Sequence, residues 1–207
     1  MTAHSNFVQW IRHHKILTAL ATMLFVVGAC KAAELLTPAK EIALIIGEPW
    51  KDMQARSSAE IGDDIPDEIW YRMPKELAYL RFADPQHGFV TPPAKFFTIG
   101  FNRGKIDSIR MSPQVEPLPL QEAVDIVLDL QNQWRKSGWE LDEPEEYPAY
   151  DNTPVWHEAL KKCAALSTHW NAGKSYQLMV VITCYEDNRY PDNKGYLVTM
   201  SMGKYRE

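Results

Sequence analysis

Apolar residues follow the spacing of an amphipathic helix in two stretches of the chain. Over residues 120–136 they fall three and four positions apart, and acidic residues occupy the opposite side. This spacing predicts a helix with one face toward a core. Residues 154–171 repeat the pattern after Thr153-Pro154, a favourable helix start. The inward stripe of this second predicted helix is Trp156, Leu160, Cys163, Ser167 and Trp170.

Two other stretches alternate with the period of two that is typical of strands. Residues 96–111 contain two short runs separated by Asn102-Arg103-Gly104, and residues 176–202 contain two more, separated by the loop at 190–195. Each stretch predicts a β-hairpin. The order hairpin, helix, helix, hairpin favours an α+β fold, in which an antiparallel sheet of about four to six strands carries the two helices.

The region before the first hairpin is less regular. Residues 42–46 form an apolar run that fits either a strand or a helical turn. Residues 50–68 are polar and contain turn signals, which predicts a loop, and residues 69–82 predict one or two strands interrupted at Pro74.

The N-terminus has a different pattern. Residues 1–15 contain Arg12, Lys15 and no acid, and the next fourteen residues, 16–29, contain no charge. A spanning helix needs about 20 apolar residues, so this run is short for one. A basic stretch, a short apolar run and small residues at its end are typical of a secretory signal peptide, here residues 1–29. An uncleaved anchor or a buried helix is the alternative.

The end of this run resembles the lipobox of bacterial lipoproteins. Val27-Gly28-Ala29-Cys30 has an aliphatic residue and two small ones before a cysteine, with Val27 in place of the usual Leu. The resemblance implies that Cys30 is lipidated and becomes the mature N-terminus, followed by a tether over residues 30–40 and a single domain over residues 41–207. Lys31 in place of Asp implies sorting to the outer membrane, with the domain facing the periplasm and contacting the membrane through the lipid alone.

Composition narrows the function classes. The chain has 207 residues, of which 45% are apolar and 24% charged, values typical of a folded soluble domain and not of a disordered chain. The net charge of −5 gives no basic excess for binding nucleic acid.

Besides Cys30, the chain has two cysteines, Cys163 and Cys184, an even pair that suits an oxidising compartment. Both fall on faces expected to point between helix and sheet, which predicts a disulfide between them; two free buried cysteines are the alternative.

The motifs of common catalytic and metal sites are missing from the sequence. It has no G-x-S-x-G, no phosphate-binding loop and no H-E-x-x-H. Asp84 and His87 supply two potential metal ligands from one loop, but a structural metal site needs four. A glycosidase pair could come from acids such as Asp63, Asp64, Glu145 and Glu146, but their spacing in space decides that. We therefore predict no enzyme, metal or cofactor.

The remaining feature is an acidic, aromatic stretch between the two helices. Residues 139–150 contain five acids, two tyrosines and a tryptophan. Clustered charge steers the encounter with a basic protein, and rigid aromatic residues anchor it; the alternative is a solvated linker whose aromatic side chains cover the helix ends. The expected partner-binding residues are Trp139, Glu143, Glu145, Glu146, Tyr147 and Tyr150.

In architecture, a lipid anchor with a compact acidic α+β domain resembles the lipoprotein immunity proteins that neutralise toxins in the periplasm. The resemblance implies a protein partner such as a basic toxin. An accessory lipoprotein for envelope assembly or cell-wall maintenance is the main alternative. A small-ligand binder or an envelope hydrolase is a further alternative.

Overall fold

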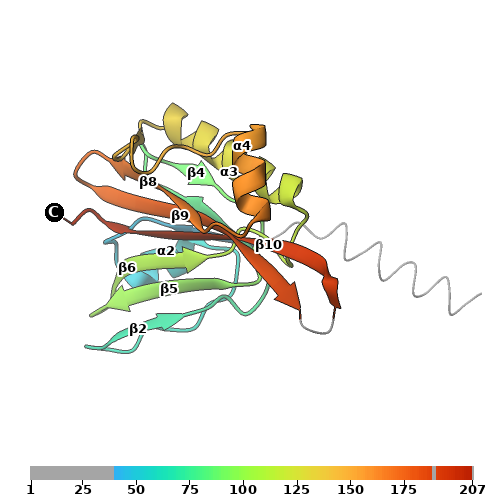
Figure 1. Ribbon diagram of the computed structural model, residues 1–207. Coiled ribbons are helices and arrows are strands. Elements are labelled where there is room, and N and C mark those ends of the chain that lie inside the picture. The colour runs from blue at the N-terminus through green and yellow to red at the C-terminus, as the bar shows by residue number, and fades with distance from the viewer. Residues whose placement is uncertain (1–39, 188–189, 207) are drawn as a thin grey trace, which may run out of the picture. The chain divides into compact units, whose positions relative to one another are not determined.

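A seven-stranded antiparallel sheet dominates the fold (Figure 1). The computed structural model describes residues 40–187 and 190–206, which belong to one compact unit; the predicted signal peptide and Cys30 lie outside the described residues. The sheet has the order β2-β5-β6-β10-β9-β8-β7. Its strands are β2 (Ile69–Arg72), β5 (Phe97–Asn102), β6 (Lys105–Met111), β7 (Glu140–Leu141), β8 (Leu166–Ala172), β9 (Tyr176–Asp187) and β10 (Tyr190–Lys204).

The α+β class and both predicted hairpins are confirmed, β5/β6 within 96–111 and β9/β10 over 176–202. The loop expected at 190–195 is wrong, because β10 begins at Tyr190 and includes these residues. The sheet is larger than the four to six strands expected, because β7 and β8 extend it at one edge and β2 at the other. Both additions come from segments without a clear hairpin signal.

A second, three-stranded sheet has the order β1-β3-β4 and was not predicted. It consists of β1 (Lys40–Leu44), β3 (Ala78–Phe82) and β4 (Phe89–Val90), and β1 pairs with β3 in parallel. The helix α2 (Trp50–Arg56) contacts β1, although its residues fall in the segment predicted as a loop. Burial of Trp50 and Met53, three positions apart, holds this short helix in place.

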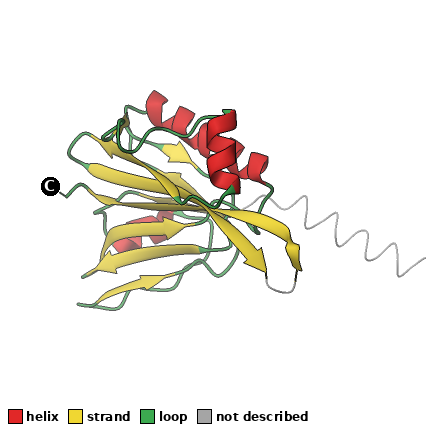
Figure 2. Ribbon diagram, in the orientation of Figure 1, coloured by secondary structure: helices red, strands yellow, loops and turns green. Residues whose placement is uncertain are grey.

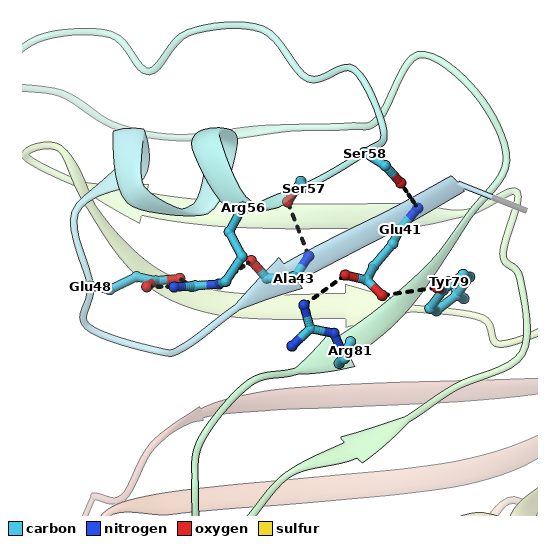
Figure 3. Close-up of polar contacts among 8 residues, drawn as sticks. All are labelled: Glu41, Ala43, Glu48, Arg56, Ser57, Ser58, Tyr79 and Arg81. Atoms are coloured by element: carbon cyan, nitrogen blue, oxygen red, sulfur yellow. Dashed lines mark hydrogen bonds and ion pairs between the residues drawn. The ribbon is translucent and has the colours of Figure 1, made fainter.

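Polar contacts fasten β1 to its neighbours (Figure 3). Arg81 on β3 donates to the Glu41 carboxylate at 2.8 Å, and the Tyr79 hydroxyl donates to the same group at 2.8 Å. The hydrogen bond from Arg81 lowers the pKa of Glu41. From beyond the end of α2, the hydroxyls of Ser57 and Ser58 accept the N–H groups of Ala43 and Glu41. This network has a structural role, because each of its members is used to join β1 to α2 or β3.

The helices α3 (Leu120–Lys136) and α4 (Pro154–Lys161) lie together on one side of the large sheet (Figure 2). The helix α3 has the bounds that the sequence predicts. The prediction of a second helix over residues 154–171 is wrong beyond residue 161. The chain turns at Cys163, where φ is +59°, and residues 166–172 form β8. Buried Thr168, Trp170 and Ala172 alternate with half-buried residues, which is the period of a strand.

The core lies between the inner face of the large sheet and the layer of helices and small sheet. Its contacts include Phe82 on β3 against Tyr176 on β9, with ring centroids 5.0 Å apart, and Trp50 on α2 against Phe101 on β5, at 5.2 Å. The helices α3 and α4 contact β9, and α3 also contacts β10. The outer face of the large sheet has no described helix over it.

A disulfide joins Cys163 to Cys184 on β9, with Cα atoms 5.3 Å apart, as the sequence predicts. Its setting differs from the expected one in two respects. Cys163 follows α4 instead of lying on its inner stripe, and β8 comes between the two cysteines in the chain. The bridge therefore fixes the end of α4 to the strand beyond β8.

Candidate functional site

The acidic segment, residues 139–150, forms one edge of the large sheet and then a tight turn. After β7, the N–H of Asp142 donates to the carbonyl of His169 on β8 at 2.8 Å. The chain then reverses at Glu143, whose φ is +43° and whose carbonyl accepts the N–H groups of Glu146 and Tyr147 at 3.0 and 2.8 Å. We call residues 142–147 the acidic turn.

The two ends of the segment are buried, which corrects their expected role as contact residues. Trp139 and Tyr150 are each only 2% exposed. The Trp139 indole N–H donates to the carbonyl of His87 at 2.9 Å, and its ring packs near Phe82 and Phe89. Large aromatic side chains in an acid-rich stretch anchor it to the core, because they bury the most apolar area.

Tyr150 is held by a network inside the protein. Its backbone N–H and carbonyl pair with the side chain of fully buried Gln131, each at 2.9 Å. Its hydroxyl donates to the carbonyl of Leu166 and accepts the N–H of Ile182. Burial raises the pKa of this hydroxyl far above its usual value. Tyr150 therefore joins α3, β8 and β9, and its side chain is not available to a partner.

The middle of the segment faces solvent. Glu143, Glu145 and Glu146 are exposed, and none of them forms an ion pair within the part of the chain that the structure describes. Tyr147 is half-buried, and its ring centroid lies 4.5 Å from that of His169. The hydrogen bond to Glu146 raises the pKa of Tyr147. Four of the six expected contact residues are thus at the surface, and they are consecutive in the acidic turn apart from Pro144.

An apolar groove of about 400 Å³ lies directly beside the acidic turn. We call it the α4 groove, since α4 supplies one wall and the start of β8 another. Glu146 and Tyr147 are at its rim, and Val155 on α4 is 79% exposed. Its main apolar lining is Pro148, Val155, Trp156, Ala159 and Leu166.

The outer face of the large sheet is also hollowed, over about 560 Å³. Asp142 and His169 line this hollow next to the turn. The strand register places Arg110, Ser201, Met179 and His169 in one row across four strands. This row mixes charged, polar and apolar side chains, and the hollow is open to solvent.

Asp84 and Asp63, two other residues considered for metal binding or catalysis, have structural partners. The carboxylate of Asp84 accepts the N–H groups of Gln86 and His87 and the hydroxyl of Tyr176, each at 2.9 Å. Burial alone would raise the pKa of Asp84, but these hydrogen bonds outweigh it and lower the pKa. In the loop before β2, Asp63 pairs with Lys51. No group of three potential metal ligands occurs among the described residues.

Within residues 40–187 and 190–206, no helix has both the length and the apolar character needed to cross a membrane. Comparisons with protein-family models, with curated proteins and with solved structures gave no match. The geometry of the acidic turn and of the α4 groove is therefore the basis for a functional assignment.

Proposed function

We propose that this chain binds a basic protein partner through the acidic turn and the α4 groove. The observation that supports the proposal most strongly is their adjacency. The turn holds three exposed acids that form no ion pair with any described residue, and its Glu146 and Tyr147 line the rim of the apolar groove. Interfaces combine an apolar centre, which supplies most of the binding energy, with a charged rim, which speeds and orients the encounter. The complementary partner surface has an apolar side chain flanked by Lys or Arg.

The negative charge of the protein and of the acidic turn favours a basic partner. The full chain has a net charge of −5, and removal of residues 1–29 takes away Arg12 and Lys15, leaving 20 basic residues against 27 acidic ones, a net charge of −7. Clustering acids on such a protein adds self-repulsion, which a basic partner relieves. Surface charge contributes little affinity by itself, so the apolar groove is the necessary second part of the site.

We further propose that the protein is an outer-membrane lipoprotein, anchored through Cys30 with the domain facing the periplasm. The sequence 27–30 and the disulfide between Cys163 and Cys184 support this location, because disulfides persist in oxidising compartments. In that location the proposed role is neutralisation of a toxin, in the manner of an immunity protein. An accessory role in envelope assembly is the alternative, and it predicts a permanent membrane complex and an envelope defect on deletion.

Affinity capture from detergent-solubilised envelopes tests the proposal. The full chain is compared with a variant that reverses the turn (Glu143→Lys, Glu145→Lys and Glu146→Lys). A control reverses three exposed acids elsewhere and so has the same net charge; these are Asp52, Glu76 and Glu116. We expect the wild type and the control to retain one basic protein that the turn variant loses. If the three chains retain the same proteins, the acidic turn is a solvated linker.

A separate variant tests the groove. Val155→Asp places a charge at its exposed wall, where it should not disturb the fold because Val155 is 79% exposed. The matched control is Val115→Asp at a position that is 49% exposed, before α3. We expect Val155→Asp to speed dissociation of the captured partner about tenfold, and Val115→Asp to leave dissociation unchanged. Equal dissociation rates in both variants would place the interface outside the groove.

A further inference from the structure

The strand β2 is an exposed apolar edge of the large sheet. Ile69, Trp70 and Tyr71 are 66%, 55% and 49% exposed, and the rings of Trp70 and Tyr71 are stacked at 5.5 Å. Exposed Met73 and Leu77 follow in the connection to β3. Soluble proteins usually protect such an edge, because its free backbone groups and apolar side chains pair readily with another strand.

The hydrogen-bond pattern shows which backbone groups of β2 point away from the sheet. Arg103 N–H, at the β5 end, donates to the carbonyl of Glu68 at 3.0 Å. In an antiparallel pair the residues facing the neighbour alternate, so Trp70 and Arg72 also face β5, and Ile69 and Tyr71 face outward. No described residue hydrogen-bonds to the outward N–H and carbonyl groups of Ile69 and Tyr71.

The outward groups match those of a second copy in one particular register. If two β2 strands pair antiparallel about a two-fold axis at Trp70, Ile69 of each copy lies opposite Tyr71 of the other. These are the residues whose backbone groups point outward, so both positions form a complete hydrogen-bonded pair. The two Trp70 residues then face each other at the axis as a pair without backbone hydrogen bonds.

The charges select the same register. Glu68 comes directly before β2 and is exposed, and Arg72 is the last residue of the strand. About the axis at Trp70, Glu68 of each copy lies opposite Arg72 of the other, which makes two ion pairs. Arg72 Nε donates to the Asp63 carbonyl at 2.8 Å, and its terminal N–H groups are left to reach across. A parallel pairing in register would instead place like charges together.

We propose that β2 pairs with β2 of a second copy of this chain, about a two-fold axis at Trp70, and joins the two large sheets. This surface is separate from the acidic turn, and the inference does not depend on the proposed function. Because a four-residue strand makes few hydrogen bonds, we expect a weak dimer whose population depends on concentration.

Disulfide trapping tests both the contact and its register. Every variant contains Cys30→Ser, so that an added cysteine is the only unpaired thiol, and the full chain is kept in detergent. Facing Cα atoms about 4.5 Å apart in such a pair are within disulfide range. We expect Trp70→Cys to form a covalent dimer under mild oxidation at least about tenfold faster than Val155→Cys, whose position is more exposed. Equal rates for the two variants would overturn the proposal.

A mixture of two further variants distinguishes this register from others and does not require loss of Trp70. We expect Ile69→Cys and Tyr71→Cys to cross-link to each other faster than either cross-links to itself. Faster self-cross-linking of each would contradict the antiparallel register. Glu68→Arg should also weaken dimerisation about tenfold by sedimentation equilibrium, while Glu76→Arg should not. A monomeric wild type at all concentrations, or trapping of Trp70→Cys only to a different protein, would overturn the proposal.

Discussion

Breaking the disulfide between Cys163 and Cys184 should destabilise the domain by an amount that follows from its position in the chain. The cysteines are 21 residues apart. A disulfide that closes a loop of this length lowers the entropy of the unfolded chain, which raises the free energy of unfolding by about 3 kcal/mol. The bridge fixes the end of α4, which is a wall of the α4 groove. Reduction should therefore lower global stability and loosen the groove together.

The assay is urea unfolding of the full chain in detergent, followed by tryptophan fluorescence with and without reductant. The free energy of unfolding of a small domain falls by about 2 kcal/mol per M urea, so a loss of about 3 kcal/mol lowers the urea midpoint of unfolding by about 1.5 M. A variant with Cys163→Ser and Cys184→Ser should unfold at the reduced midpoint and not respond to reductant. A midpoint shift below about 0.5 M, or alkylation of both thiols in oxidised protein, would show that this disulfide does not stabilise the domain.

Two further predictions concern buried polar groups. The pKa of Asp84 is lowered in the folded state, so the contribution of its ionised carboxylate to stability is complete above the unfolded pKa of about 3.9 and is lost as pH falls through the lower folded value. Asp84→Asn should lower the free energy of unfolding by about 1–3 kcal/mol near neutral pH, and it should flatten the acid limb of a urea-midpoint profile as pH falls from about 5 to about 2. Tyr150→Phe should cost about 1–3 kcal/mol in the same unfolding assay, because the carbonyl of Leu166 and the N–H of Ile182 lose their shared partner. A midpoint unchanged by either substitution would contradict the corresponding hydrogen bonds.

Sequence periodicity predicts the parts of this fold whose pattern is unambiguous. The hairpins and α3 have a spacing that fits one structure only. Residues 164–171 fit two, because Thr168 and Trp170 keep the period of a strand while Trp170 also continues the helical stripe. The turn at Cys163 decides between them through a positive φ, which a residue other than glycine does not signal. The parallel pairing of β1 with β3 depends on contacts distant in the chain and leaves no local pattern.

The candidate site could be predicted in part. The acids of the turn are exposed because they are charged, which composition alone indicates. The sequence does not show which aromatic residues turn inward, since that depends on partners such as Gln131, which is 19 residues from Tyr150. The α4 groove was also missed, because its walls come from the acidic segment, α4 and β8. The local sequence signal for the groove is an apolar residue, Val155, in the first turn of the predicted helix; its exposure is seen in the structure alone.

Binding through the acidic turn is tested best by the salt dependence of the rate of association with the captured basic partner. We expect the wild-type association rate to fall steeply as salt rises. Reversal of Glu143, Glu145 and Glu146 should lower the rate at low salt about tenfold or more and should flatten this salt dependence. The control chain with Asp52, Glu76 and Glu116 reversed should keep most of the dependence. Identical rates and salt dependence in the wild type and the turn variant, with both folded, would contradict a partner-binding role for the acidic turn.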